Sequence, residues 1–383
     1  MKKILIVTNV PNPYRIALFN ELNRQLRERG MELHVVFGAE GYARRLNKTD
    51  LGNATFHHRI LDGGVYTSQE NTERTFFGYS GLSAVLDELQ PYRTIIIGFS
   101  AGTLRLFLRS FYKNEQYIIW AGSLKKEGRN DNIARIISRK LMMKRASAFI
   151  AYGSKAKEYL VSMGASPERV SIAMNTSDPA FFLAETDKIR QEGMATMGDG
   201  KKHLLYIGYL VRRKNVGLLI ECMAELRKHR NDFILDIVGD GESREQLEKQ
   251  ASELNLSEHV KFHGFRQKSE LPAFLAQSSV FLFQTDFDVW GLTVNEAMAA
   301  GLPVLSSIHA GATFDLIEEG VTGYAVDFRQ RSKISALLQP LLDHPERCKE
   351  MGMKARERLL AKASLEKSAS GFIDAIEKSA TKN

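Results

Sequence analysis

Cysteine and long hydrophobic runs are almost absent from this sequence of 383 residues. Its two cysteines, Cys222 and Cys348, are too few for a disulfide framework or a multi-cysteine metal site. This excludes the small disulfide-rich secreted class and favours a reducing compartment. No apolar run approaches the roughly 20 residues that a transmembrane helix needs. The apolar stretch at residues 4–10 is short for a signal peptide and better suits a first β-strand, so we expect a cytoplasmic protein.

Proline is also scarce, with 9 residues against 29 glycines, and charged residues make up an ordinary 26% of the chain. These values exclude collagen-like and low-complexity architectures and argue against global disorder. At roughly 150 residues per domain, the length favours two domains that each bury a core.

The positive charge is concentrated in one part of the sequence. The net charge of the chain is +8, and residues 101–150 alone contain 11 basic and 3 acidic residues. Such a local excess attracts phosphates, nucleic acid or an anionic membrane face. Nucleic acid is the weakest of these partners because the basic segments lack aromatic stacking motifs and a known fold signature.

Two segments in this region have the pattern of basic amphipathic helices, residues 103–113 and 133–146. One interpretation is that their apolar stripes pack on a sheet and their cations are solvated; the other is that they contact an anionic membrane. The first segment has the apolar stripe Leu104, Phe107, Leu108, Phe111 and Tyr112, beside the cations Arg105, Arg109 and Lys113. The second carries the cations Arg135, Arg139, Lys140, Lys144 and Arg145.

Short β-branched runs alternate with helical patterns along the whole chain, which predicts an α/β fold of two doubly wound parallel sheets. We expect the first domain over residues 1–185 and the second over residues 203–360. The polar residues 186–202 are interpreted as a linker, and residues 361–383 as a C-terminal helix that returns toward the first domain. Because open parallel sheets bind ligands beyond the carboxyl ends of their strands, a ligand cleft is expected between the two domains.

The richest of the loops that follow predicted strands lies within residues 281–307. Gly291 permits a close backbone approach, and a helix is expected to begin at Leu292. The free amides of Leu292, Thr293 and Val294, with the positive end of the helix dipole, would form a diphosphate site. Asp288 before this helix and Glu296 inside it can hold two different hydroxyl clusters of one ligand.

Three further loops complete this predicted site in the second domain. Gly208 is followed by the cations Arg212, Arg213 and Lys214, which would neutralise a departing diphosphate. Residues 237–244 contain Gly239 but lack the third glycine of a dinucleotide fingerprint. Phe265 follows a predicted strand at a position where the backbone could contact a base.

Taken in order, these four loops resemble the nucleotide-sugar half of glycosyltransferase family 4. The most specific motif of that family, E-x-F-G-L-x-x-x-E-A-M-A-x-G-x-P-V, is written here D-V-W-G-L-T-V-N-E-A-M-A-A-G-L-P-V from Asp288. The resemblance covers residues 200–360 and continues more faintly through residues 151–178. It implies the GT-B fold, a retaining mechanism, and catalytic roles for Asp288, Lys214, Arg213 and Arg212.

The sequence departs from the family pattern at three places. Asp288 replaces the first glutamate, and Tyr209 stands where the family has arginine, so that Arg212 or Arg213 would supply the second cation beside Lys214. The first domain lacks the usual paired-glycine loop and the usual histidine after the strand near Trp120. We place the acceptor contacts of that domain on Tyr14, Arg15, Ser123 and Lys125.

The resulting expectation is a retaining glycosyltransferase that moves a sugar from a UDP- or GDP-sugar to a glycan or lipid-linked acceptor, in surface polysaccharide or glycolipid biosynthesis. It would be cytoplasmic, with a peripheral contact to the inner membrane face through residues 101–150. Two alternatives remain: an inactive nucleotide-sugar-binding module, and an NAD-dependent oxidoreductase on the same sheets.

No cofactor and no metal are expected. Asp286 and Asp288 spell D-x-D, which permits a metal-dependent reading, but Asp288 occupies the family's glutamate position and cations already neutralise the phosphates. None of the nine histidines has convincing ligand spacing.

Overall fold

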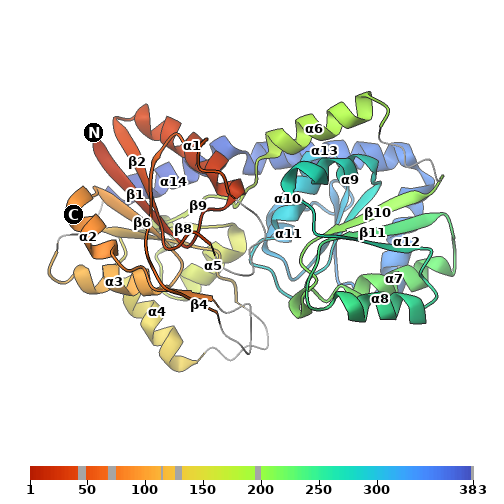
Figure 1. The fold of residues 1–383 in the computed structure, drawn as a ribbon, viewed down its shortest axis with the longest axis horizontal. Helices are drawn as coiled ribbons and strands as arrows, with labels where there is room; N and C mark the ends of the chain where they lie inside the picture. Colours follow the sequence, from red (N-terminus) through yellow and green to blue (C-terminus); the bar gives the residue numbers. More distant parts are fainter. Residues whose placement is uncertain (42–48, 68–74, 114, 126–131, 195–199, 381–383) are drawn as a thin grey trace. The chain divides into compact units, whose positions relative to one another are not determined.

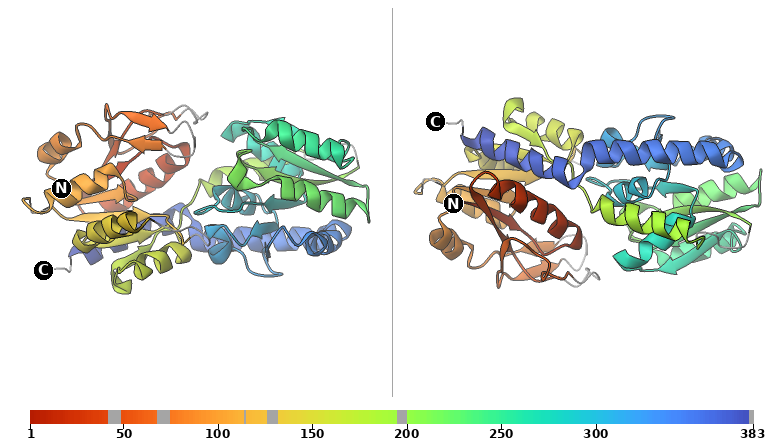
Figure 2. Two further views of the ribbon diagram at one scale, coloured as in Figure 1. Left: turned by 90° about the horizontal axis from the view of Figure 1, so that it is seen from below. Right: turned by 90° about the horizontal axis from the view of Figure 1, so that it is seen from above.

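The computed structural model describes residues 1–41, 49–67, 75–113, 115–125, 132–194 and 200–380, and the chain divides into two compact units. Unit 1 comprises Met1–Ser177 and Leu365–Asn383, and unit 2 comprises Asp178–Ser364. Each unit has a parallel sheet with helices on both faces (Figures 1 and 2). The predicted architecture of two doubly wound α/β domains is therefore confirmed.

The sheet of unit 1 has seven parallel strands in the order β3-β2-β1-β6-β7-β8-β9. The chain first moves outward from β1 to β2 and β3, then returns to the other side of β1 with β6, so the sheet has a topological switch point between β1 and β6. The strands are β1 (Lys2–Thr8), β2 (Met31–Phe37), β3 (His57–Ile60), β6 (Arg93–Ile97), β7 (Tyr117–Ala121), β8 (Ala148–Ala151) and β9 (Val170–Ile172). A short antiparallel pair, β4 (Val65–Thr67) and β5 (Thr75–Phe77), stands apart from it.

Helix α1 (Pro13–Arg27) packs against the C-terminal helix α14 (Leu365–Ala380), which also contacts β8 and β9. The remaining helices of unit 1 follow the strands from β5 to β8 (Figure 1). They are α2 (Leu82–Leu89), α3 (Ala101–Arg109), α4 (Ile133–Arg145), α5 (Ser154–Ser162) and the short η1 (Pro167–Arg169). The apolar run Ile4 to Val7 in β1 is fully buried, as expected for a central parallel strand covered on both faces.

The sheet of unit 2 has six parallel strands in the order β12-β11-β10-β13-β14-β15, with a switch point between β10 and β13. Its core is formed by side chains of all these strands and of the helices that cover them, including Tyr206, Phe233 and Leu282. The strands are β10 (Lys202–Ile207), β11 (Phe233–Val238), β12 (Val260–Gly264), β13 (Val280–Phe283), β14 (Val304–Ser307) and β15 (Gly323–Val326).

The helices of unit 2 lie on the two faces of this sheet. In the view of Figure 1, α7, α8 and α12 lie below the sheet, and α6, α9, α10 and α13 lie above it. They are α6 (Pro179–Gln191), η2 (Arg212–Lys214), α7 (Gly217–Arg227), α8 (Arg244–Glu253), η3 (Lys268–Glu270), α9 (Leu271–Gln277), α10 (Leu292–Ala299), α11 (Gly311–Leu316), α12 (Arg331–Asp343) and α13 (Pro345–Ala363).

The predicted linker 186–202 is wrong over its first part, because residues up to Gln191 belong to helix α6. Asp178 accepts a hydrogen bond at the N-cap of this helix, and Phe182 and Thr186 are buried where α6 packs against α9 and α10. The polar sequence concealed these contacts. Unit 1 accordingly ends at Ser177 rather than at residue 185, and its C-terminal part begins at Leu365 rather than at residue 361.

Helix α3 does not pack its predicted apolar stripe into the core. Leu104 and Leu108 are exposed, whereas Thr103, Leu106 and Arg109 are buried. Arg109 is only 4% exposed because its guanidinium is held by Asp87 and Glu115, at 2.8 and 2.5 Å. The predicted set of solvated or lipid-facing cations on this helix therefore does not include Arg109.

Candidate functional site

The four sequence-predicted loops of unit 2 meet at one edge of its sheet. They follow β10, β11, β12 and β13, and because these strands are parallel, their carboxyl ends share that edge. The loops after β10 and β13 flank the switch point, where open α/β sheets bind their ligands. The topology thus brings Lys214 and Asp288, which are 74 residues apart in the sequence, into contact beside this switch point.

Close backbone packing joins the loops after β10 and β11. A Cβ atom on Gly239 would lie 1.9 Å from the carbonyl oxygen of Gly208, so only glycine fits there. Gly239 also has φ +148°, and its N–H donates to the carbonyl of Gly264 at 2.9 Å, which ties in the loop after β12. These contacts explain why the glycines of the motif occur where they do.

Gly291 sets the approach to helix α10. Its φ is +103°, and a Cβ atom would come within 2.6 Å of the ring of Phe283. No side chain caps the N-terminus of α10, and the buried hydroxyl of Thr293 has no hydrogen-bond partner among the described residues. The prediction of a free amide at Val294 is wrong, because its N–H donates to the carbonyl of Gly291 at 3.0 Å. The first turn therefore presents the N–H groups of Leu292 and Thr293 and the positive end of the helix dipole to an anion.

Asp288 and Lys214 form the centre of the site. The Lys214 ammonium donates to Oδ2 of Asp288 at 2.6 Å and lies 4.5 Å from the centre of the Phe283 ring. Arg213 approaches the same oxygen at 3.4 Å and donates to the carbonyl of Phe287 at 3.2 Å. The other Asp288 oxygen accepts from the N–H of Trp290 at 3.1 Å.

Burial and charge act in opposite directions on Asp288. Burial alone would raise the pKa of its carboxyl group, but Lys214 and Arg213 hold that pKa below its ordinary value. The carboxylate is therefore ionised at neutral pH, and it lies against the ammonium of Lys214, which is only 5% exposed. Two cations against one carboxylate leave this group net positive.

The structure distinguishes between the two candidate cations beside Lys214. Arg213 reaches Asp288, whereas the side chain of Arg212 is exposed and is not among the groups that contact Asp288. Tyr209, at the position where the family has arginine, is half-buried. The second cation of the central cluster is thus Arg213.

Glu296 lies inside α10, one turn after its start, and is half-buried. Burial raises the pKa of its carboxyl group to about 8, and the charge of Lys268 opposes this only weakly. Within the described part of the chain, no hydrogen bond to this carboxyl group is found. A half-buried carboxyl group without donors is suited to receive the hydroxyls of a ligand.

Both carboxylates of the D-x-D sequence are held by groups of the chain itself. Asp286 accepts from Asn215 at 3.0 Å and pairs with Arg329 at 3.1 Å, while Asp288 is held by Lys214 and Arg213. A divalent metal at this position would have to displace these cations.

One buried cluster near the loops was not predicted from the sequence. Asp236 of β11 is 2% exposed and lies between two histidines, at 2.6 Å from His203 and 2.7 Å from His263. Burial works against the Asp236 charge, but the two histidines lower its pKa. His263 directly precedes Gly264 and Phe265, which is half-buried, so the cluster fixes the end of β12 where that loop begins. The sequence signal that could have indicated this cluster is the presence of polar residues on three neighbouring strands.

The carboxyl edge of the unit 1 sheet has a different character. Arg15 of α1 is 5% exposed and donates to Thr8 at 2.6 Å and to Tyr152 at 2.9 Å. Its guanidinium lies 4.5 Å from the Trp120 ring, and no carboxylate within the described ranges pairs with it. Of the other predicted acceptor residues, Tyr14 and Ser123 are half-buried and Lys125 is exposed.

Histidine ligands were not predicted, but unit 1 brings three potential metal ligands together. Glu32, His34 and His57 have ligand atoms within 4.8 Å of one another, and the two imidazole rings stack at 4.7 Å. They lie on β2 and the edge strand β3, away from the carboxyl-edge loops. His34 Nε2 already bonds Glu32 at 3.1 Å.

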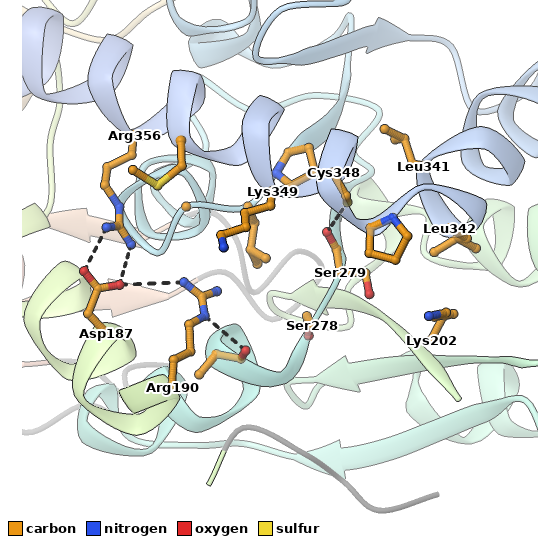
Figure 3. A pocket seen from close by; sticks show the side chains of 16 residues that line it. Asp187, Arg190, Lys202, Ser278, Ser279, Leu341, Leu342, Cys348, Lys349 and Arg356 are labelled. Atoms are coloured by element: carbon orange, nitrogen blue, oxygen red, sulfur yellow. Dashed lines mark hydrogen bonds and ion pairs between the residues drawn. The ribbon is translucent and has the colours of Figure 1, made fainter. Parts of the chain in front are cut away.

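A cavity of about 320 Å³ lies at the opposite edge of the unit 2 sheet, lined by residues at the starts of β10, β13 and β14 (Figure 3). Figure 3 shows Arg190 and Arg356 both turned toward Asp187. Arg356 donates to this carboxylate twice at 2.8 Å, and Arg190 donates to the carbonyl of Ala300 at 2.6 Å. These arginines join α6 to α10 and α13, and the cavity is separate from the four loops.

Comparison with known families agrees with the motifs of unit 2. Residues 188–358 match the family described as glycosyl transferases group 1. A GDP-mannose-dependent alpha-(1-6)-phosphatidylinositol monomannoside mannosyltransferase of Mycolicibacterium smegmatis is 30% identical over 61% of this chain and 59% of its own length. An alpha-D-kanosaminyltransferase of Streptomyces kanamyceticus is 28% identical over 61% of both chains. The chain thus spans about three fifths of the length of these curated relatives.

Solved structures extend the likeness to the whole fold. The structure of Anabaena HepE in complex with UDP has a TM-score of 0.76 at 17% identity, over 98% of this chain and 100% of that chain. A glycosyltransferase from Rickettsia africae has a TM-score of 0.76 at 13% identity. The GT-B fold and the resemblance to glycosyltransferase family 4 are confirmed.

Proposed function

We propose that this chain, whose residues 188–358 belong to the group 1 glycosyltransferases, transfers a sugar from a nucleotide-sugar donor to a glycan or lipid-linked acceptor with retention of configuration. The observation that carries the proposal is the ion pair between the buried Lys214 and the half-buried Asp288 beside the uncapped start of α10. It provides positive charge for a diphosphate and a carboxylate for a sugar at one switch point.

The donor would bind with its diphosphate at the first turn of α10, near Lys214 and Arg213. The charge on the diphosphate grows as the bond from the anomeric carbon to the phosphate oxygen breaks, and the two cations and the helix dipole stabilise that charge. The acceptor oxygen forms the new bond to the anomeric carbon on the same face. Its proton passes to the leaving diphosphate oxygen, so the reaction needs no side-chain base.

Asp288 has two roles in this scheme. It keeps the Lys214 ammonium in place, and its carboxylate faces the position of the transferred sugar. Glu296 would accept hydrogen bonds from the ribose hydroxyls, which provide the donors that its carboxyl group lacks in the described chain. The loop of Gly264 and Phe265 would contact the base.

We infer a UDP- or GDP-sugar donor. The mycobacterial relative named above is GDP-mannose-dependent, and the Anabaena structure contains UDP. Relatives named for amylovoran and colanic acid biosynthesis favour surface polysaccharide or glycolipid as the product class. We propose metal-independent transfer, because cations of the chain occupy both carboxylates of the D-x-D sequence.

The enzyme would work in the cytoplasm, with the acceptor contacted through Tyr14, Arg15, Ser123 and Lys125 of unit 1. We place it as a peripheral protein at the inner face of the cell membrane, where lipid-linked acceptors are reached. No helix in the described residues is long and apolar enough to cross a membrane.

A thermal-shift panel of UDP-, GDP-, ADP- and dTDP-sugars tests this function. One base class should raise the melting temperature selectively, because a ligand that binds only the folded state stabilises it. The same donor should then be hydrolysed slowly without acceptor, and EDTA should leave that rate unchanged. Selective binding without any turnover would instead show a nucleotide-sugar-binding module, and NAD binding in its place would revive the oxidoreductase reading.

A further inference from the structure

Helices α3 and α4 of unit 1, with the turn that follows α3, expose large apolar side chains to solvent on a scale that core packing does not explain. Ile133 is 74% exposed, Tyr112 69% and Phe111 61%. The two helices pack against each other, so their exposed side chains belong to one neighbourhood, which we term the α3–α4 surface. Its apolar members are Leu104, Leu108, Phe111, Tyr112, Ile133, Ile137 and Leu141.

The spacing of these residues shows that the exposure is a property of whole helix faces. Ile133, Ile137 and Leu141 follow one another at intervals of four residues, which places them on one face of α4. The face that α4 buries carries Met142 and Met143 instead. Scattered exposed leucines need no explanation, but a contiguous apolar patch of this kind marks an interaction site.

The charge on α4 identifies the kind of partner. The helix contains five cations and no acidic residue: Arg135, Arg139, Lys140, Lys144 and Arg145. Lys140 and Lys144 are exposed, and no carboxylate of the described chain pairs with either. Arg145 lies over the ring of Phe111 at 4.3 Å, so cationic and apolar groups are interleaved on this surface.

We propose that the α3–α4 surface docks on an anionic lipid bilayer, with its apolar side chains in the interfacial region and the α4 cations among the phosphates. A helix with an apolar stripe and basic flanks lies in the plane of a membrane interface by this means. A second copy of the chain fits less well, because a twofold contact would bring two sets of five cations together.

The structure thereby changes which residues make this contact. Arg109, which the sequence pattern offered as a membrane-facing cation, is buried with Asp87 and Glu115, and Lys113 lies 3.6 Å from Asp87. Arg105 donates to the carbonyl of Tyr79 at 2.7 Å. Arg139 of α4 is half-buried and donates to the hydroxyl of Tyr159 at 2.5 Å. The cations of the surface are therefore the exposed ones of α4, namely Arg135, Lys140, Lys144 and Arg145, and α3 with the turn after it contributes apolar groups.

The inference deepens the proposed function, since it names where the enzyme meets a lipid-linked acceptor, but docking needs no donor. The test is co-sedimentation of the full chain, without nucleotide sugar, with vesicles of phosphatidylglycerol and phosphatidylcholine or of phosphatidylcholine alone. We expect binding to the anionic vesicles only, falling steeply with salt. Binding in this assay and transfer from a donor in solution can fail independently of each other.

Two variants separate the charged and apolar contributions. Lys140→Glu with Lys144→Glu should weaken binding by about tenfold or more, since each basic residue near an anionic surface contributes about 1 kcal/mol. Ile133→Ser with Ile137→Ser should weaken it even at low salt. The matched control, Lys333→Glu with Lys349→Glu in unit 2, makes the same charge change at exposed positions and should bind like wild type.

A fluorescent label gives a readout independent of charge. Both native cysteines are buried, so a thiol-reactive environment-sensitive dye should select the variant residue of Ile137→Cys. Its emission should shift to the blue with anionic vesicles, whereas a dye on Lys349→Cys should not shift. The proposal would be overturned if the emission of the Ile137→Cys label did not shift with anionic vesicles. It would also be overturned if the Lys140→Glu, Lys144→Glu variant bound vesicles like wild type, or if the chain formed a stable dimer that Ile133→Ser disrupts.

Discussion

The switch points of the two sheets share a topology but not a chemistry. In unit 2, Lys214 and Asp288 meet at 2.6 Å, so a buried cation has an ionised partner. In unit 1, Arg15 is equally buried, yet its partners are the hydroxyls of Thr8 and Tyr152 and the ring of Trp120. The first arrangement can exchange a carboxylate contact for a phosphate contact, whereas the second holds a cation that has no counter-charge among the residues that the structure describes.

This difference shows what the scaffold determines and what the loops add. Both sheets deliver side chains to a carboxyl edge, and at both edges a glycine packs against neighbouring backbone, Gly239 against Gly208 in unit 2 and Gly63 against Gly38 in unit 1. Unit 2 adds the uncapped start of α10 beside the cations Lys214 and Arg213. Close backbone approach and net positive charge favour a diphosphate there. The aromatic and hydroxyl groups around Arg15 favour a less highly charged ligand.

The largest effect should come from removing the central cation of unit 2. Lys214→Ala should lower the rate of transfer by about 10²–10³, because one preorganised contact to the leaving diphosphate is lost. Arg212→Ala is the matched control, since Arg212 is exposed and away from Asp288. Steady-state kinetics on both variants measure the difference. Equal rates for the two variants would remove Lys214 from the mechanism.

A second prediction compares the two buried cations by stability. Lys214→Met leaves Asp288 as a largely buried carboxylate with Arg213 alone, and losing one partner of a buried pair typically costs about 3–5 kcal/mol. Arg15→Met leaves no charge behind and should cost less. Denaturant unfolding at pH 7 measures both variants, and a larger loss for Arg15→Met would contradict the contrast between the two switch points.

A third and smaller effect concerns Glu296. Its pKa of about 8 lies above its ordinary value, so the stability that the protonated group contributes is complete below about pH 4.5 and is lost as pH rises through 8. The melting temperature of wild type should therefore fall, relative to that of Glu296→Gln, as pH rises from about 4.5 to about 8.

Donor binding should act on the same group. Ribose hydroxyls stabilise the carboxylate, so binding at pH 7 should release a proton, and donor affinity should rise with pH up to about 8. Calorimetry in two buffers of different ionisation enthalpy detects this release. A release of the same size in Glu296→Gln would show that another group titrates.

The site of unit 2 could be predicted because its signals are local. The glycines, the run Arg212 to Lys214 and the helix start at Leu292 each follow a strand, and parallel strands bring such loops to one edge. What the sequence could not distinguish was Arg213 from Arg212, since the choice depends on how the loop after β10 faces the backbone of Phe287.

The wrong predictions have a common physical cause. The periodicity of apolar residues predicts a helix, but it does not determine which face of that helix is buried. The apolar stripe of residues 103–113 was visible, but Asp87 and Glu115 turn α3 by binding Arg109 in the interior. Likewise, the polar residues of α6 concealed a helix held by distant groups, among them Arg356 on Asp187. The cluster of Asp236 with His203 and His263 depended on the register of three strands.

A crystal structure of the chain with the UDP- or GDP-sugar that raises its melting temperature tests the central claim most directly. We expect the diphosphate at the first turn of α10, within hydrogen-bond distance of Lys214, and the ribose hydroxyls on Glu296. A nucleotide bound instead beside Arg15 in unit 1, or in the cavity lined by Arg190 and Lys202, would contradict it.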